Sequence, residues 1–464
     1  MNKQIKSFFQ VLSSNIFVSF SGIFTGVLIP ILLTETEYGY WQYYLTYASY
    51  AALLLFGFCD GIYIKYGGEK YETIDKQRLN YMYYFMLAML TLITSVLFLL
   101  VIGFGIKDST KKITLFAVLG SVFLQCVISF FTLLNQATGR FNIYSVGNTI
   151  ERSVLLITAL FCIWRNSLSI FPLLIISIIS KLLVVFYYAI HSRDVILLIP
   201  HKYNGWREDI RENFVIGLPI TVCGIISLVM GGFGKMFIEW TSGMVNLAYY
   251  SFACSSISII SQVIVAASLV VFPSLKNANE NKIDEFIHFG ENIINASMPI
   301  LMLSYYPILI AVSVIINKYL MSMKFVPVIL PMILFQSKIN ILYANTYKVR
   351  RKERELMKRG GIGLGANILL VSVFYLSTKS LMMVALASTL SYFIWYYSLR
   401  KGMGEKFSVR DVIMTLFIVV IAVAEIYCSV GVGLLISIIA SVIYIVLNKK
   451  VYLNTIKLAR RIKK

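Results

Sequence analysis

The sequence predicts an all-α, polytopic membrane protein of about 14 transmembrane helices, arranged as two six-helix bundles plus two C-terminal helices. The first observation is composition: 58% of the 464 residues are hydrophobic and 14% are charged, whereas soluble domains average about 45–50% apolar and about 25% charged residues. The second is that apolar runs of ~20 residues, the length that crosses a bilayer, recur from end to end. The third is how the basic residues divide between the loops.

The expected spans follow one another with short connections. The first begins after Lys3 and Lys6 and continues past Pro30 without a small-residue cleavage site, so we interpret it as a retained span rather than a signal peptide. In order, the expected spans are 8–33, 39–63, 80–104, 113–138, 142–163, 169–190, 213–235, 245–272, 291–316, 325–346, 361–377, 380–399, 411–428 and 430–447.

The loop charges test this assignment independently. If the loops alternate sides starting from the cytoplasm, about thirty basic residues fall inside and only eight fall outside. This is the positive-inside bias of membrane proteins, and a missed span in the first half would have spoiled it. We therefore expect a membrane protein with both termini in the cytoplasm.

The connection 191–212 divides the spans into six plus eight. Six helices return the chain to its starting side, so a second bundle would be a parallel repeat. The expected organisation is an N-terminal bundle at 1–190, a cytoplasmic linker at 191–212, a C-terminal bundle at 213–402, and helices 13 and 14 with a basic cytoplasmic tail at 403–464. From residue 448 onward the tail alternates basic and apolar residues, and it either lies on anionic lipid headgroups or frays.

Several functional classes are excluded. The net charge of +20 would suggest nucleic acid in a soluble chain, but here the basic residues sit between apolar runs, and no nucleic-acid-binding motif accompanies them. The six cysteines show no CxxC spacing, so neither a metal nor a disulfide is expected. The three histidines have no evident catalytic partner, and no phosphate-cradling GxxxxGK loop occurs. We therefore expect no catalytic residues, no cofactor and no enzymatic activity.

Four charged residues fall near the middle of predicted spans, where a charge costs at least ~2.5–3.5 kcal/mol. Three are cations, Arg152, Lys181 and Lys338, and one is an acid, Glu151. An excess of cations in a low dielectric needs an anion, and a diphosphate headgroup would accept charge-assisted hydrogen bonds from Arg and Lys. The alternative for Glu151 and Lys181 is a purely structural pair.

Polar residues also recur at helical spacing within the first bundle. In the second span Gln42 shares a face with Asp60, because eighteen residues make five helical turns. In the fifth span Asn148 lies one turn from Arg152. These stripes indicate either a hydrated, substrate-binding cavity or ordinary packing between helices.

Three segments resemble a known family. The second span ends in Leu55-Phe-Gly-Phe-Cys-Asp-Gly-Ile-Tyr-Ile-Lys-Tyr-Gly-Gly; the turn before the fifth reads Gln136-Ala-Thr-Gly-Arg-Phe-Asn-Ile-Tyr, with Glu151-Arg152 following; and the eighth ends in Val271-Phe-Pro-Ser-Leu. These resemble the oligosaccharide flippases of O-antigen and capsule synthesis, in the polysaccharide transporter family of the multidrug/oligosaccharidyl-lipid/polysaccharide exporter superfamily. The resemblance covers nearly the whole chain.

The resemblance implies a fold like that of the multidrug-and-toxin-extrusion (MATE) transporters, with helices 1, 2, 7 and 8 lining a central cavity. It also implies alternating access, coupled to H⁺, Na⁺ or membrane potential. Carried over by position, Asp60, Arg140, Glu151 and Arg152 match the family. Lys181 and Lys338 come only from their depth in the predicted spans.

The leading hypothesis is a flippase that translocates undecaprenyl-diphosphate-linked oligosaccharide repeat units. Lys65 and Arg140 would gather the diphosphate at a basic cytoplasmic mouth, and the mid-span cations would hold it. The implied partners are this lipid-linked oligosaccharide, anionic membrane lipids and the polysaccharide polymerase machinery. The alternatives are a cation-coupled exporter of small molecules on the same fold, a polymerase or ligase acting on the same lipid, and a structural scaffold. The short outer loops argue against the enzymes.

Overall fold

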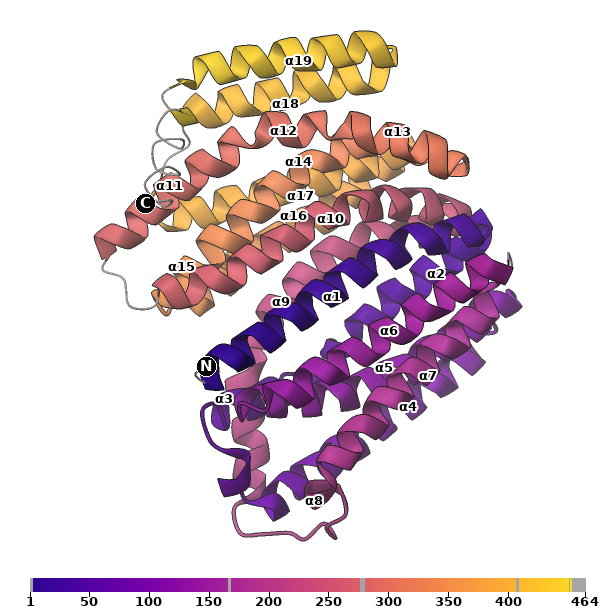
Figure 1. Cartoon of the computed structure of the whole chain (residues 1–464), viewed down its shortest axis with the longest axis vertical. Coiled ribbons are helices and arrows are strands. Elements are labelled where there is room, and N and C mark those ends of the chain that lie inside the picture. The colour runs from indigo at the N-terminus through magenta and orange to yellow at the C-terminus, as the bar shows by residue number, and fades with distance from the viewer. Residues whose placement is uncertain (1–2, 166–167, 276–279, 406–408, 450, 453–464) are drawn as a thin grey trace. The chain divides into compact units, whose positions relative to one another are not determined.

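The computed structural model describes residues 3–165, 168–275, 280–405, 409–449 and 451–452, and for 3–12, 259, 261–275 and 281 it describes the backbone alone. Within these ranges the chain is helical and contains no strand, which confirms the predicted class. The helices, labelled in Figure 1, are α1 (Lys3–Leu32), α2 (Glu35–Ala48), η1 (Ser49–Leu55), α3 (Phe58–Lys65), η2 (Tyr71–Thr73), α4 (Lys76–Gly103), α5 (Ser109–Ala137), α6 (Phe141–Arg165), α7 (Ile170–His191), α8 (Arg193–Ile196), α9 (Trp206–Ser242), α10 (Met244–Leu275), α11 (Glu280–Ala296), α12 (Met298–Leu303), α13 (Tyr305–Ile315), η3 (Asn317–Lys324), α14 (Val326–Ser337), η4 (Lys338–Tyr343), α15 (Ala344–Val349), α16 (Glu353–Thr378), α17 (Leu381–Gly402), α18 (Val409–Tyr427) and α19 (Val430–Leu447).

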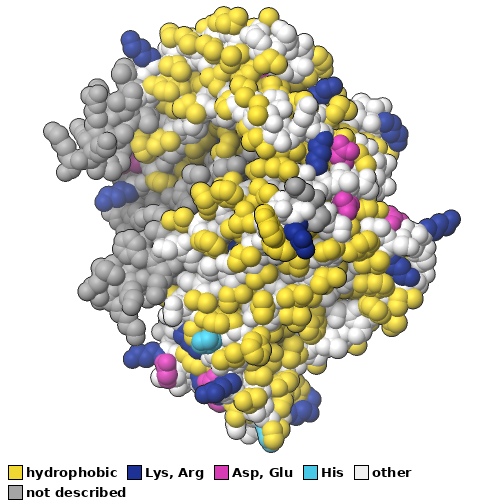
Figure 2. Space-filling view, turned by 45° about the vertical axis from the view of Figure 1, so that its right-hand side comes forward, with side chains coloured by type: hydrophobic (Ala, Val, Ile, Leu, Met, Phe, Trp, Pro, Cys, Tyr) yellow, Lys and Arg dark blue, Asp and Glu magenta, His cyan; other side chains and the backbone are white. Residues whose placement is uncertain are grey.

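The helices have the length and surface of membrane spans. Among the described residues, 11 helices are long and apolar enough to cross a bilayer, and a bent pair makes a twelfth. The two other predicted spans coincide with α10 and α18, so each of the fourteen falls on a helix or a run of helices. Large apolar side chains such as Leu92 and Val314 are exposed, and the face shown in Figure 2 is largely hydrophobic. The protein is therefore a multi-pass membrane protein.

The chain forms two compact units. The first unit comprises Met1–Leu228 with Ser242–Ala248, and the second comprises Val229–Thr241 with Tyr249–Lys464. In the second unit α18 and α19 pack side by side (Figure 1). The finer four-part division expected from the sequence stays a prediction, and the expected basic tail lies outside the described residues apart from 448–449 and 451–452.

Side chains that accept hydrogen bonds from unpaired backbone N–H groups start several helices. Thr34 and Glu37 form a reciprocal capping box at α2, with the Glu37 amide 3.3 Å from Thr34 Oγ1 and the Thr34 amide 3.1 Å from Glu37 Oε2. Asp75 caps α4, and Asp108 caps α5 by accepting from the Lys111 amide at 3.0 Å. These polar residues fix where one helix ends and the next begins.

The second predicted span is broken rather than continuous. Between η1 and α3 the chain bends by 61°. Phe56 and Gly57 both adopt left-handed backbone conformations there, with φ of 47° and 84°. Two successive residues of this kind interrupt a right-handed helix, and glycine makes the second one inexpensive. The expected helix 39–63 is therefore two helices of different direction.

Glycines bring α3 and the first half of α9 into backbone contact within the first unit. A methyl group on Gly217 of α9 would overlap the carbonyl oxygen of Gly57, and one on Gly61 would overlap the carbonyl oxygen of Asn213. Close approach through small residues is the usual way in which membrane helices pack tightly. Helix α9 begins at Trp206, inside the segment expected as a linker.

Candidate functional site

Lys181 lies in a polar contact network inside the first unit. Its Nζ donates to Gln125 Oε1 of α5 at 2.6 Å and to Glu151 Oε1 of α6 at 2.7 Å. The Lys181 side chain is 10% exposed and that of Glu151 is 22% exposed. The expectation of an unmatched cation at Lys181 is therefore wrong, because the chain itself supplies the acid. The structural pair that the sequence left open is present.

A chain of hydroxyls adjoins this pair. The Tyr44 hydroxyl of α2 donates to Ser121 Oγ at 2.7 Å and lies 2.8 Å from Ser177 Oγ. Ser121 is one helical turn from Gln125, and Ser177 is one turn from Lys181, so the network crosses four helices. Sequence reasoning missed Tyr44, Ser121, Gln125 and Ser177. The signal for this network is the four-residue spacing of Ser121 with Gln125 and of Ser177 with Lys181, which places each pair on one face of its helix.

Arg152 is the mid-span cation that remains without an acidic partner among the described residues. It is exposed on α6 and makes no hydrogen bond or ion pair within the described part of the chain. Asn148, half-buried one turn earlier, shares its face. Ser145, seven residues before Arg152, accepts from Ser14 of α1 at 3.0 Å. Within the described part of the chain, Arg152 and Asn148 thus present unused donors near the contact of α1 with α6.

Asp60 and Gln42 are engaged within the first unit. Asp60 Oδ2 accepts from the Thr221 hydroxyl of α9 at 2.5 Å, directly beside the glycine contact of α3 and α9. Gln42 is buried, and its Nε2 donates to the Tyr38 hydroxyl at 2.8 Å on the same helix. The break at Phe56 and Gly57 separates Gln42 from Asp60. The expectation that they share one continuous helical face is therefore wrong.

Lys65 is the first of the two cations expected at the basic mouth. Its Nζ lies 2.7 Å from Asp209 Oδ1 and 2.5 Å from Glu212 Oε2, at the start of α9. Arg78 and the Tyr203 hydroxyl also donate to Asp209. Lys65 is thus held by acids of its own chain, which fasten the end of α3 to α9.

Arg140 is the second of the two cations expected at the basic mouth. Its Nη2 donates to the His191 carbonyl at 2.7 Å, and the guanidinium lies over the Tyr71 ring, 3.9 Å from the centroid. Its Nη1 is buried and has no hydrogen-bond partner in the part of the chain that the structure describes. The stacked ring orients the guanidinium, and a spare donor remains at this end of the first unit.

In the second unit Lys338 opens the π-helical stretch η4 and is fully buried. Its Nζ lies 3.9 Å from Asp411 Oδ1 and 3.5 Å from the Tyr396 hydroxyl. The expectation that Lys338 lacks an acidic partner is wrong, because Asp411 of α18 meets it. A π-helical turn inside an α-helix often marks a functional position.

Lys338 belongs to a larger buried group around Arg400 of α17. Arg400 donates to Asp411 Oδ2 at 2.5 Å and to the Tyr396 hydroxyl at 2.9 Å, and it lies 3.6 Å from Glu291 and 3.1 Å from Glu405. We call this the Arg400 cluster: Glu291, Lys338, Tyr343, Tyr396, Arg400, Glu405 and Asp411. Sequence reasoning did not single out Arg400 or the acids around it.

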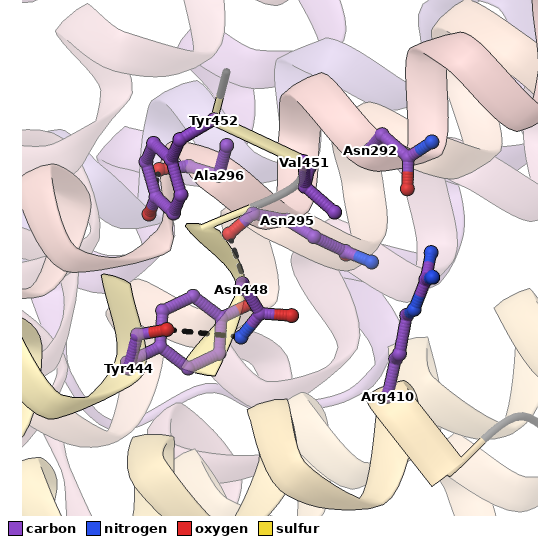
Figure 3. A pocket seen from close by; sticks show the side chains of 8 residues that line it. All are labelled: Asn292, Asn295, Ala296, Arg410, Tyr444, Asn448, Val451 and Tyr452. Atoms are coloured by element: carbon purple, nitrogen blue, oxygen red, sulfur yellow. Dashed lines mark hydrogen bonds between the residues drawn. The ribbon is translucent and has the colours of Figure 1, made fainter. Parts of the chain in front are cut away.

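A small polar pocket adjoins the ends of α11, α18 and α19 in the second unit (Figure 3). It has an empty volume of about 240 Å³, including the open space at its mouth. Figure 3 shows the side chains of Asn292 and Asn295 directed toward Arg410. Asn295 Oδ1 is buried, and within the described ranges it has no hydrogen-bond partner. The lining residues are Asn292, Asn295, Ala296, Arg410, Tyr444, Asn448, Val451 and Tyr452.

No metal centre was expected, and within the described ranges no group of three or more His, Cys, Asp or Glu residues is arranged to hold a metal ion. The cysteines Cys59, Cys126, Cys162, Cys223, Cys254 and Cys428 are all free thiols. What the two units offer is charged and polar groups inside helical bundles. Ionisable groups inside membrane helices are rare and commonly mark functional positions.

Solved structures share this fold. A structure described as "Lipid II flippase MurJ, inward closed conformation" matches with a TM-score of 0.69 at 15% identity, covering 96% of this chain and 99% of that one. An inward-facing MATE-family multidrug transporter matches with a TM-score of 0.57 at 13% identity, covering 84% and 94%. An outward-facing form of such a transporter gives 0.54 at 11% identity, covering 84% and 95%. The comparison with curated protein sequences gave no match.

The fold therefore places the protein in the class of polytopic membrane proteins with the architecture shared by MATE transporters and the lipid II flippase. Residues 5–278 match the model of the family described as polysaccharide biosynthesis protein. The chain belongs to this family. This confirms the family resemblance that the three sequence motifs indicated.

Proposed function

We propose that the protein is a flippase that carries undecaprenyl-diphosphate-linked oligosaccharide repeat units across the bacterial inner membrane for O-antigen or capsule synthesis. Membership in the polysaccharide biosynthesis family supports the pathway. The fold shared with a lipid II flippase supports a lipid-linked sugar as the cargo. The observation within the chain that carries the proposal is Arg152, an exposed cation in the middle of α6 that no acid of the described residues neutralises.

The ion pairs of Lys181 and Lys338 reduce the number of cations that could bind a phosphate. Lys181 and Lys338 face Glu151 and Asp411, so their charges are not left over for a ligand. The proposed diphosphate site therefore centres on Arg152, with Asn148 as a neighbouring donor. Arginine presents a planar fork of donors that suits phosphate oxygens. That Lys181 and Lys338 bind the substrate stays a prediction, and the proposed site on Arg152 does not depend on it.

Arg140 is the proposed gathering residue at the cytoplasmic end. It has a buried, unused Nη1 donor, whereas Lys65 is already shared between Asp209 and Glu212. A diphosphate would satisfy that donor before moving to Arg152. The polyprenyl tail would remain in lipid, and polar groups of the first unit would hydrate the sugar. Alternating access, its coupling to H⁺, Na⁺ or membrane potential, and an association with polymerase machinery stay predictions.

A reconstituted assay tests the site. Purified protein in proteoliposomes is supplied with fluorescent undecaprenyl-diphosphate oligosaccharide, and the label that reaches the opposite leaflet is measured. We expect Arg152→Ala to reduce translocation at least tenfold and Arg152→Lys to restore part of it, because lysine keeps the charge without the fork. Arg165→Ala, at the exposed end of the same helix, is the matched control. Undiminished transport by a folded Arg152→Ala variant would refute the site.

The competing function is cation-coupled export of small molecules, which the fold shared with multidrug transporters favours. It requires acidic groups free to meet a cation. In the first unit, however, Glu151 is paired with Lys181 and Asp60 accepts from Thr221. Efflux of amphipathic cations from vesicles, unaffected by Arg152→Ala, would favour this function over the flippase.

A further inference from the structure

The Arg400 cluster holds more acidic than basic groups. Within it, two cations, Lys338 and Arg400, meet three carboxyls, Glu291, Glu405 and Asp411. The side chains of Arg400 and Glu291 are each 8% exposed, and that of Asp411 is 4% exposed. An uncompensated charge in such a site is costly, and an ionisable group commonly becomes neutral instead. The charge balance therefore favours one additional proton.

Counting hydrogens leads to the same conclusion. The Tyr343 hydroxyl lies 2.8 Å from Glu291 Oε1 and 3.3 Å from Glu405 Oε2. A tyrosine hydroxyl has one hydrogen to donate, so it cannot serve two ionised carboxylates at once. A proton on one of the two acids removes the conflict, because that acid then donates to the tyrosine oxygen.

Glu405 is the better carrier of this proton. Glu291 Oε1 also accepts from the Tyr396 hydroxyl at 2.8 Å, so its ionised form is already stabilised by a second donor. The Glu405 side chain is 19% exposed, which gives it a path to water that Glu291 and Asp411 lack. Burial, followed by repulsion from Glu291, raises the pKa of Glu405.

Charged and titratable groups from several segments surround Glu405. Glu291 and His288 belong to α11, and the charge of His288 opposes the shift in the pKa of Glu405. Lys338 and Tyr343 lie on η4 and Tyr396 and Arg400 on α17, while Asp411 begins α18. Glu405 itself lies in the connection between α17 and α18. A change in its charge is therefore felt where α18 is fastened to the rest of the second unit.

We propose that the Arg400 cluster is a proton-binding site in which Glu405 carries the proton, shares it with Tyr343 and exchanges it with water. On release, the O–H bond of the Glu405 carboxyl breaks, the proton passes to water, and the carboxylate that remains pairs with Arg400. Protonation thus decides whether the connection between α17 and α18 is bound by an ion pair or by a neutral hydrogen bond. This site does not depend on the cargo, so it can be tested without transport.

Infrared difference spectroscopy on the full chain in lipid nanodiscs tests this proposal. The pH is raised from about 5, where carboxyls of ordinary pKa are already mostly ionised, to about 9, and loss of the C=O stretching band of protonated carboxyls is followed. We expect wild-type protein to lose a band that Glu405→Gln does not show at any pH. Glu355→Gln is the matched control, because Glu355 forms a partly exposed pair with Arg359 of the same helix at 2.7 Å.

Two further results decide the assignment. A band that persists unchanged in Glu405→Gln, or that disappears in Glu291→Gln while Glu405→Gln retains it, would overturn the proposal. Glutamine has the shape of a protonated glutamate, so we expect Glu405→Gln to fold, with a wild-type elution profile checking this. If the band behaves as expected and transport of lipid-linked sugar is nevertheless absent, the proposed function fails while the proton site stands.

Discussion

Lys181 of α7 and Glu151 of α6 form an ion pair, with Nζ and Oε1 2.7 Å apart, inside the first unit. This pair separates two neighbours in the sequence. Adjacent residues of a helix do not share a face. Glu151 therefore turns toward α7, whereas Arg152 lies on another side of α6 and is exposed. Glu151 is thus engaged by Lys181, and Arg152 has no acidic partner among the described residues.

Breaking the pair should destabilise the first unit. In Glu151→Gln the Lys181 ammonium keeps Gln125 but loses its acid, which we expect to cost about 1–3 kcal/mol, less than the ~3–5 kcal/mol of a fully buried pair because Glu151 is partly exposed. Lys181→Met combined with Glu151→Gln should recover much of this loss. Thermal unfolding of the two single variants and the double variant in nanodiscs measures the coupling. Additive losses would show that the two side chains do not interact energetically.

The glycine contact between α3 and α9 should tolerate no side chain. In Gly217→Ala the new methyl group meets the backbone of Gly57 and Gly61, which cannot move aside as a flexible side chain would. We expect a loss of at least ~1–3 kcal/mol, typical of overpacking. Gly224→Ala is the control on the same helix, because nothing lies within 4 Å of the added methyl group. Equal melting temperatures for the two variants would contradict the contact.

Glu425 of α18 should lower the stability of the second unit. Its side chain is buried, and both carboxyl oxygens lack a hydrogen-bond partner among the described residues. Because an unsatisfied buried polar group costs about 1–3 kcal/mol, Glu425→Leu should stabilise the second unit by a similar amount. The midpoint of thermal or denaturant unfolding checks this. A lower midpoint in Glu425→Leu would mean that the carboxyl has a role which the static contacts do not reveal.

The stability of the second unit should fall as the pH rises through the range where Glu405 titrates. Burial and Glu291 raise the pKa of Glu405 in the folded chain, so the folded state holds a proton that the unfolded state has already released. As the pH rises, stability then decreases between the ordinary glutamate pKa of ~4.3 and the raised pKa of Glu405 in the folded chain, and it is constant at higher pH. Melting temperatures measured across pH should show this slope.

In Glu405→Gln that part of the pH dependence should vanish, because glutamine does not titrate. Glu355→Gln should keep the wild-type slope, since Glu355 lies on α16 in a partly exposed pair with Arg359 and outside the Arg400 cluster. An unchanged slope in Glu405→Gln would assign the pH dependence to another group.

The helical plan could be predicted because span length and loop charge depend on local composition. Each of the fourteen predicted spans falls on a helix or a run of helices. The break at Phe56 and Gly57 was missed, because a phenylalanine and a glycine inside an apolar run look the same whether the backbone there is right-handed or left-handed. Only the bend of 61° reveals it.

The candidate site was predicted less completely, because ion pairs join residues far apart in the chain. Depth in a span identified Lys338 and Lys181, but it gave no information on which acids approach them. Asp411 lies in the thirteenth predicted span and Glu291 at the edge of the ninth, so neither is a sequence neighbour of Lys338. The Glu151–Lys181 alternative was identified because both residues fell at similar depth in successive spans.

The contact of Gly57 with Gly217 has a consequence for how such a chain can diversify. Main-chain atoms make this contact between α3 and α9, so the contact imposes no particular shape on the side chains around it. Residues on the remaining faces of α3 and α9 can be exchanged freely as long as the small residues stay. Related chains can therefore keep one scaffold through extensive drift, and we expect the glycines of this contact to be among the last positions to vary.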